Sequence, residues 1–298
     1  PLTATIRQIA YANGHLFVAA DFAGLVVIDV RSPASPQIVN RVKSGRASAL
    51  LVNGTLAYVV DATAGLRVFD VSTPNAPVQI ALVSTLRQTA YSIVQLGTRL
   101  LIARGYEGIE IVDISQPSQP VVLGRRTFAT PITSLLVAGE ALYAGSSGTD
   151  WKVLRIGDGA QISEVATIAG NVRAGVVAGS VLYAAEWLGL ATYDISDPFA
   201  PRQSGWFDSF TRFSDTSADS AQMLLAAGAR LFVLNALQQV RVFDISQPQI
   251  PTPVGVLDRP IGDAHSVQAA AGRLFVLENS RLRIQSLAAP SAPSLTGS

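Results

Sequence analysis

The sequence predicts an all-β fold, a seven-bladed β-propeller with four antiparallel strands per blade. The first observation is an internal repeat: one motif, clearest as GLRVFDVSTPNAP at residues 65–77, recurs seven times with variations. The second is its spacing, because the positions equivalent to Asp70 stand 39 to 50 residues apart, close to the ~40–45 residues of a propeller blade. The third is the composition of each copy, in which short runs rich in Val, Ile and Leu end at Gly, Asn, Asp and Pro.

Each copy reads as four strands. In the second copy, apolar runs occupy residues 48–54, 56–61, 65–71 and 78–83. Asn53-Gly54 between the first two runs is a hairpin signal, because both residues accept positive φ. The runs are nearly continuous rather than alternating, so neighbouring blades should cover both faces of each sheet. Glycines at the same place in every copy give a second mark with the same period: Gly14, Gly54, Gly97, Gly139, Gly179, Gly228 and Gly272.

The unbroken repeat predicts one domain, residues 1–298. The expected blades cover roughly residues 6–42, 46–83, 89–125, 131–168, 172–206, 220–256 and 264–298. The fourth strand of the last blade, near residues 294–297, has a weak pattern. We therefore expect residues 1–5 to help close that blade, so that the two ends of the chain meet.

Composition excludes several classes of protein. The chain is 49% hydrophobic and only 14% charged, against about a quarter charged in typical domains. Its net charge of +1 gives no bulk attraction to nucleic acid. No apolar run approaches the ~18 residues of a membrane-spanning helix. Cysteine is absent, which excludes disulfides and thiolate metal sites.

The repeat resembles a known family. The segments LVVIDVRSPASP (25–36), LRVFDVSTPNAP (66–77), IEIVDISQPSQP (109–120), LATYDISDPFAP (190–201) and VRVFDISQPQIP (240–251) are similar to the LVIVD repeat. The resemblance implies a bacterial or archaeal β-propeller, often a secreted or cell-surface protein. Two copies depart from it: WKVLRIGDG (151–159) lacks the Asp and both prolines, and LRIQSLAAPSAP (282–293) lacks the Asp. The motif describes the scaffold and says little about function.

The recurring Asp of the motif has a structural interpretation. In Asp-Val-Ser-x-Pro, Asp70 precedes a turn and can accept the backbone N–H of the residue two positions later. Such a bond caps the end of the strand. A catalytic carboxylate repeated in five blades makes little chemical sense.

Antiparallel strands sort the loops onto two faces of the ring. The loops between strands two and three share a face with the connections between blades, and acids and arginines alternate there. The expected axial polar rim consists of Asp21, Asp61, Glu107, Glu186, Glu278 and His265. Mutual pairing is one interpretation, and exposed pairs of this kind contribute only ~0–1 kcal/mol. The alternatives are recognition of an anionic or sugar-like ligand and a carboxylate-only Ca2+ site; no cofactor is otherwise predicted.

The longest step in the repeat, 50 residues, contains an aromatic loop. Long loops that break a repeat often carry function, and exposed aromatic rings suit a protein interface or a sugar. The expected partner-binding residues are Trp206, Phe207, Phe210, Arg212 and Phe213. In the alternative interpretation, some of these rings fill the gap between two blades.

Three functions remain open on the sequence alone. There is no H-E-x-x-H, G-x-S-x-G, Walker A or G-x-G-x-x-G string. The leading expectation is a non-enzymatic binding or scaffold propeller outside the cytoplasm, with a protein or surface glycan as partner rather than a small molecule. One alternative is a metal-dependent hydrolase or lyase that uses the axial carboxylates and His265. The other is a structural subunit of a larger surface or membrane-associated assembly, which would pack through its blade edges.

Overall fold

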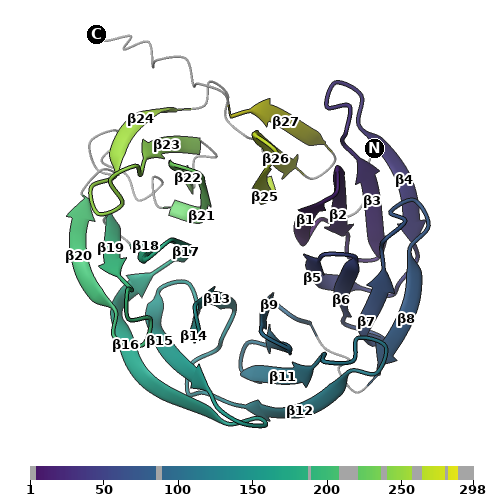
Figure 1. The fold of residues 1–298 in the computed structure, drawn as a ribbon, viewed down its shortest axis with the longest axis horizontal. Coiled ribbons are helices and arrows are strands. Elements are labelled where there is room, and N and C mark those ends of the chain that lie inside the picture. Colours follow the sequence, from purple (N-terminus) through teal and green to yellow (C-terminus); the bar gives the residue numbers. More distant parts are fainter. Residues whose placement is uncertain are drawn as a thin grey trace.

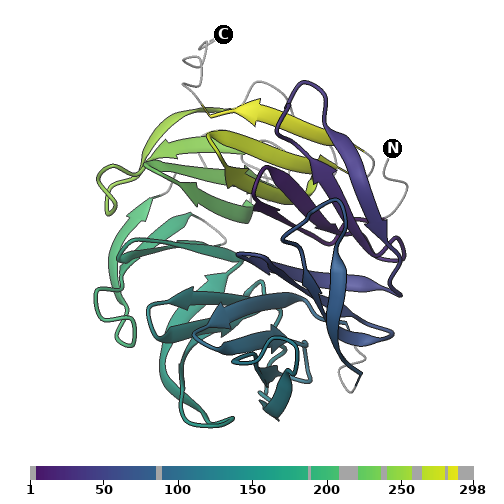
Figure 2. The same ribbon diagram turned by 45° about the vertical axis from the view of Figure 1, so that its right-hand side comes forward.

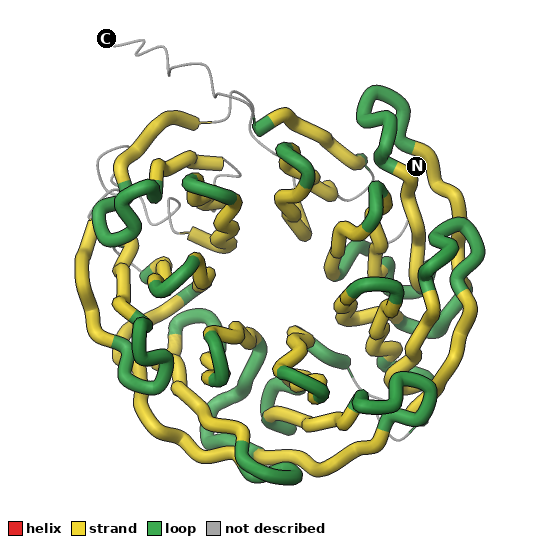
Figure 3. Tube along the Cα trace, viewed as in Figure 1, coloured by secondary structure: helices red, strands yellow, loops and turns green. Residues whose placement is uncertain are grey.

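The fold is the expected seven-bladed β-propeller. A computed structural model describes residues 5–84, 89–186, 189–207, 221–235, 240–256, 264–278 and 281–287. These residues contain 27 strands in seven antiparallel sheets that surround a central axis (Figure 1). Within them every element is a strand or a loop, as Figure 3 shows. The described ranges contain no helix that is long and apolar enough to cross a membrane.

The strands of each blade lie side by side in sequence order. Blade one has β1 (Gln8–Ala12), β2 (His15–Ala19), β3 (Leu25–Asp29) and β4 (Gln37–Val42). Blade two has β5 (Ala47–Asn53), β6 (Leu56–Asp61), β7 (Gly65–Asp70) and β8 (Val78–Val83). Blade three has β9 (Ser92–Leu96), β10 (Arg99–Ala103), β11 (Ile109–Asp113) and β12 (Val121–Arg126). Blade four has β13 (Ser134–Ala138), β14 (Ala141–Gly145), β15 (Thr149–Ile156) and β16 (Ile162–Val172).

The remaining blades follow the same plan. Blade five has β17 (Ala174–Ala178), β18 (Val181–Ala185), β19 (Leu190–Asp194) and β20 (Arg202–Phe207). Blade six has β21 (Ala221–Ala227), β22 (Arg230–Asn235), β23 (Val240–Asp244) and β24 (Thr252–Val256). Blade seven has β25 (Ala264–Ala270), β26 (Arg273–Glu278) and β27 (Leu282–Ser286). Its expected fourth strand at 294–297, and residues 1–4 of the expected closing strand, lie outside the described residues.

The core lies between adjacent blades. The second strand of a blade is buried along its whole length in β2, β14 and β18, whereas the outer strands β4 and β8 contain no buried residue. One apolar cluster joins Phe17 and Val27 of blade one to Leu50 and Val59 of blade two. This arrangement explains the continuous apolar runs, because each sheet is covered on both faces. Figure 2 shows the sheets stacked around the ring.

Blade seven packs against blade one and closes the ring. The rings of Tyr11 and Phe275 stack with their centroids 5.5 Å apart. The backbone N–H of Ile9 donates to Ser266 Oγ at 3.2 Å. Buried Ile9 and Leu16 share an apolar cluster with Phe275 and, at its margin, Ile284. Closure is therefore visible in the described residues as packing between β1 and β25–β27.

Two tyrosines connect neighbouring blades through buried hydroxyl groups. Tyr143 in blade four donates to the carbonyl of Pro198 in blade five at 2.6 Å. Tyr183 in blade five donates to the carbonyl of Pro248 in blade six at 2.7 Å. Burial raises the pKa of Tyr183 to about 12, so its hydroxyl keeps the proton that it donates. The proline turns of the repeat thus serve as acceptors for the preceding blade.

The glycine that opens strand three is required by a close approach to strand four. A Cβ atom on Gly65 would lie 2.0 Å from the carbonyl oxygen of Val83, and one on Gly108 would lie 1.9 Å from that of Arg126. Both glycines have positive φ. No other residue fits there without a backbone shift.

Each of the first six outer strands contains a bulge opposite the middle of strand three. The registers shift there in β4, β8, β12, β16, β20 and β24. Bulges bend a strand and interrupt its edge, which hinders pairing with another chain. The repeat therefore protects its own outer edges.

Candidate functional site

The turns fall on two faces, as expected from the antiparallel strands. Isolated bridges join Asp21 to Ala47 and Gly105 to Ile132, so loops between strands two and three lie beside the connections between blades. We call this side the loop face; it carries residues 20–24, 61–65, 104–108, 186 and 189. The opposite side, which carries the glycine hairpins and the proline turns, is the hairpin face.

Asp61 is an internal anchor of the loop face. Its side chain is 0% exposed. It accepts hydrogen bonds from the backbone N–H groups of Gly45 (2.6 Å) and Arg46 (2.9 Å), and from both N–H and Oγ1 of Thr63 (2.9 and 2.7 Å). Arg67 pairs with it at 3.2 Å. Burial alone would raise the pKa of Asp61, but these hydrogen bonds outweigh burial and lower the pKa to about 2.

Asp21 joins blade one to blade two. Its carboxylate, nearly buried, accepts from Arg7 at 2.8 Å and from Arg46 at 2.9 Å. The guanidinium group of Arg46 also lies over the ring of Phe22, 5.7 Å from its centroid. Each oxygen of Asp21 is thus paired with an arginine.

In blade three, acid and base exchange places relative to the Asp61–Arg67 pair of blade two. The residue that directly follows strand two there is Arg104, which pairs with Glu110 on β11 at 2.5 Å, and both side chains are buried. Burial raises the pKa of Glu110, and burial lowers the pKa of Arg104. Glu107 lies three residues further along, in a half-exposed ion pair with Arg125. Glu107 therefore does not occupy the place that Asp61 has in blade two.

The remaining expected rim residues lie on blades five and seven. Glu186 follows β18 and accepts a hydrogen bond from the Tyr193 hydroxyl at 3.2 Å, while burial raises its pKa. His265 is the extra residue of a bulge in β25, and Glu278 ends β26; their side chains lie outside the described structure. Among the described residues, no three His, Asp or Glu side chains gather closely enough to hold a metal ion. The face holds the expected acids, but each described one has its own partner.

The aromatic loop is only partly described. Trp206 on β20 is 43% exposed, and its ring lies against Gly189 of the loop face. Phe207 is half-buried and packs in the cluster between blades five and six. Phe210, Arg212 and Phe213 lie outside the described residues. Phe207 thus fits the alternative interpretation, in which rings of this segment fill a gap between blades.

Three exposed aromatic residues on the loop face were missed by sequence reasoning. Phe22 is 76% exposed, Tyr91 57% and Tyr106 78%. The ring of Tyr91 lies against Gly105, next to Tyr106. A signal was available, because Phe22 and Tyr106 both stand in the loop that follows strand two. Aligning these loops across the repeats would have found it.

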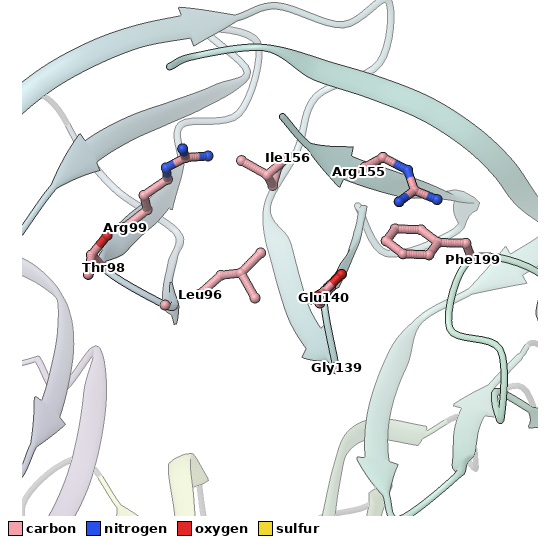
Figure 4. A pocket seen from close by; sticks show the side chains of 9 residues that line it. Leu96, Thr98, Arg99, Gly139, Glu140, Arg155, Ile156 and Phe199 are labelled. Carbon is pink, nitrogen blue, oxygen red and sulfur yellow. The ribbon is translucent and has the colours of Figure 1, made fainter. Parts of the chain in front are cut away.

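A pocket lies on the hairpin face between blades three and four (Figure 4). Its volume is about 590 Å³, within the range of ~300–1,000 Å³ found for small-molecule sites. The guanidinium group of Arg155 lies 3.6 Å from the centroid of the Phe199 ring. Arg99 donates to the carbonyl of Gly157 at 2.5 Å. The lining residues are Leu96, Gly97, Thr98, Arg99, Gly139, Glu140, Arg155, Ile156 and Phe199.

Comparison with known proteins identifies the repeat. The LVIVD repeat family matches residues 7–43, 44–85 and 90–127, which contain the strands of blades one to three. The chain is therefore a seven-bladed β-propeller whose first three blades match LVIVD repeats. Curated proteins include no match to this LVIVD propeller.

Solved structures resemble the LVIVD propeller in fold. The computationally designed Ika8 protein is 11% identical, with 95% of this chain and 96% of that one covered and a TM-score of 0.67. A candidate 6-phosphogluconolactonase from Bacteroides fragilis is 12% identical, with coverage of 91% and 86% and a TM-score of 0.69. At such low identity, these likenesses concern the fold alone.

The recurring Asp of the LVIVD propeller caps its turn as the sequence predicts. Each accepts the backbone N–H of the residue two positions later at 2.8–2.9 Å; the five are Asp29, Asp70, Asp113, Asp194 and Asp244. These bonds lower the pKa of Asp70. In the fourth copy Arg155 stands at this position and stacks on Phe199 instead. The most divergent copy of the repeat thus borders the pocket.

Proposed function

We propose that this LVIVD propeller is a non-enzymatic binding or scaffold module that presents its loop face to a protein partner. The observation that carries the proposal is the exposure of Phe22, Tyr91 and Tyr106 on that face. Tyrosine and arginine are enriched among the residues that dominate binding energy at protein interfaces. Arg46 beside Phe22 and Arg125 beside Glu107 add polar groups around the rings.

The geometry of the acids supports binding over metal-dependent catalysis. A hydrolase or lyase of the expected kind would direct several axial carboxylates at one ion. Asp21 and Asp61 instead face arginines and backbone N–H groups, and Glu107 faces Arg125.

A paired set of variants tests the proposal. Phe22→Ser with Tyr106→Ser removes two rings from the loop face, whereas Val78→Ser with Val121→Ser removes two exposed side chains from outer strands. Immobilised wild type and both double variants are exposed to an extract of the source cells, and retained proteins are identified by mass spectrometry. A partner retained by wild type and the valine variant, but not by the aromatic variant, supports the proposal. Equal retention by all three, with unchanged thermal unfolding, contradicts it.

A surface glycan would use the same rings in a different way. Sugar rings stack on exposed aromatic faces, so a glycan array probed with the same three proteins separates this outcome from a protein partner. We extend the proposal to a secreted or cell-surface location, because the LVIVD resemblance implies one. Fractionation of the source cells tests that part directly.

The outer strands favour a second candidate, a structural subunit that packs through its blade edges. Val78, Leu82 and Val121 are exposed on β8 and β12. Side-by-side packing predicts that wild type associates with increasing concentration in analytical ultracentrifugation and that the valine variant stays monomeric. The bulges of the outer strands weigh against strand pairing, so such contacts would join side chains rather than backbones.

A further inference from the structure

The pocket between blades three and four lies where the recurring position at the end of strand three changes from an acid to a base. Five copies carry a carboxylate at the end of strand three, and the fourth carries Arg155. The same copy replaces the proline turn with Gly157-Asp158-Gly159, and the carbonyl of Gly157 accepts a hydrogen bond from Arg99. One departure from the repeat therefore brings two guanidinium groups to the walls of one pocket.

Stacking holds the guanidinium group of Arg155 in place and leaves the N–H donors along its edge available to a ligand. Phe199 from blade five covers one flat face of the Arg155 guanidinium at 3.6 Å. The N–H donors of a guanidinium lie in its plane, so stacking leaves them for a ligand. In Figure 4 Ile156 lies between Arg155 and Arg99, and Leu96 and Glu140 line the same space.

The charges of the pocket are not matched by contacts between its own residues. Elsewhere on the hairpin face, Arg31 is paired with Asp29, and Arg230 is paired with Asp244. Among the ion pairs within the described ranges, none involves Arg99 or Arg155. Glu140 is the one acid among the lining residues, and Asp113 lies opposite Arg99 on β11 and interacts with it electrostatically, so the unmatched positive charge at the pocket is that of Arg155.

We propose that this pocket binds a small organic monocarboxylate with an apolar body. A guanidinium fork matches a carboxylate with two parallel hydrogen bonds. Leu96, Ile156 and Phe199 supply apolar wall for the rest of the molecule. Glu140 repels a second negative charge, so a monoanion is preferred over phosphate dianion or a dicarboxylate. The site is distant from the loop face and does not depend on the function proposed above.

Phenylacetate is a suitable probe because it combines one carboxylate with an apolar ring. Saturation-transfer NMR on the whole chain should show saturable binding of phenylacetate, and 2-phenylethanol, which lacks the charge, should bind about tenfold more weakly or less. Arg155→Asp restores the residue type of the other copies and should abolish binding. Arg31→Gln is the matched control, since it removes an arginine on the same face that is already paired, and it should leave binding unchanged.

A second variant addresses selectivity and does not alter the arginines. Glu140→Gln should strengthen the binding of inorganic phosphate by about fivefold or more while leaving phenylacetate at least as tightly bound. The proposal is overturned by absence of saturable phenylacetate binding to wild type, by equal binding of 2-phenylethanol, or by an Arg155→Asp variant that binds like wild type. If Arg155→Asp does not fold, Arg155→Gln takes its place. The proposal is then overturned if Arg155→Gln and Glu140→Gln both keep the wild-type preference for phenylacetate over inorganic phosphate.

Discussion

Asp61 offers the sharpest test of the claim that the loop-face acids belong to the scaffold. Its buried carboxylate accepts hydrogen bonds from Gly45, Arg46 and Thr63, together with the Arg67 ion pair. In Asp61→Asn one oxygen becomes an NH2 group, which faces donors instead of accepting from them. We expect the free energy of unfolding at pH 7 to fall by about 2–4 kcal/mol, the cost of breaking a buried, hydrogen-bonded charge.

The pKa of Asp61 gives an independent estimate of the same energy. The folded pKa is lowered from its ordinary value of 3.8 to about 2. A lowered acid pKa means that the ionised form stabilises the fold, by about 2.4 kcal/mol at pH 7. This contribution is fully present above the unfolded pKa and is lost as the pH falls through the folded pKa. At pH 3 about half of it, ~1.3 kcal/mol, remains.

Urea unfolding at pH 7 and pH 3 measures both effects. The stability difference between wild type and Asp61→Asn should shrink by about 1 kcal/mol between the two pH values. Asp158→Asn removes an exposed carboxylate and serves as the control, with a difference within about 0.5 kcal/mol at either pH. A difference that is below about 0.5 kcal/mol at pH 7, or that stays constant down to pH 3, would refute the assignment of Asp61 as an anchor. Thr63→Val removes one donor and should give a smaller loss of the same sign.

Three further substitutions test the packing of the ring. Tyr143→Phe loses the hydrogen bond to the Pro198 carbonyl, so the free energy of unfolding should fall by about 1 kcal/mol in urea titrations; an unchanged value would show that this bond contributes nothing. Gly108→Ala brings a methyl group against a strand-four carbonyl and should lower the melting temperature more than Gly97→Ala, which meets nothing within 4 Å; equal effects would contradict the close approach. Phe275→Ala should cost about 3–5 kcal/mol, because that ring closes the circle between blades seven and one, and a melting temperature close to that of wild type would contradict its role.

The architecture was predictable because its signals are local. An Asn-Gly pair such as Asn13-Gly14, in which both residues have positive φ, fixes a hairpin within two residues, and the seven copies of the repeat fix the number of blades. At Asn53-Gly54 the loop is displaced by one residue, because Asn53 pairs with Leu56. Continuous apolar runs indicate sheets covered on both faces, which is what the buried β2, β14 and β18 show. None of these inferences depends on how one blade is placed against the next.

The sites were harder to predict because they depend on contacts between blades or between loops. Asp61 looked like one member of a ring of acids, but its partners Gly45 and Arg46 come from the connection that enters its blade. Asp61 and Arg104 occupy equivalent positions in blades two and three, and this change from acid to base indicates that each pairs with an opposite charge within its own blade. The stacking of Arg155 on Phe199 joins residues of two blades, so the sequence showed only that the fourth copy had lost its Asp.

The cost of releasing each group decides which residues of the ring are free to act on a ligand. For Asp61 to bind an ion it would have to give up hydrogen bonds from Gly45, Arg46 and Thr63, and each buried donor left without a partner costs about 1–3 kcal/mol. The rings of Phe22 and Tyr106 and the edge of the Arg155 guanidinium carry no comparable cost, because they are exposed or stacked by one face only. The groups repeated around the ring thus stabilise the fold. Binding a ligand costs the least free energy where a loop or a copy departs from the repeat. A protein is therefore best recognised by the loop-face aromatics and an anion by the fourth-copy pocket, whereas the axial acids are poorly suited to a metal.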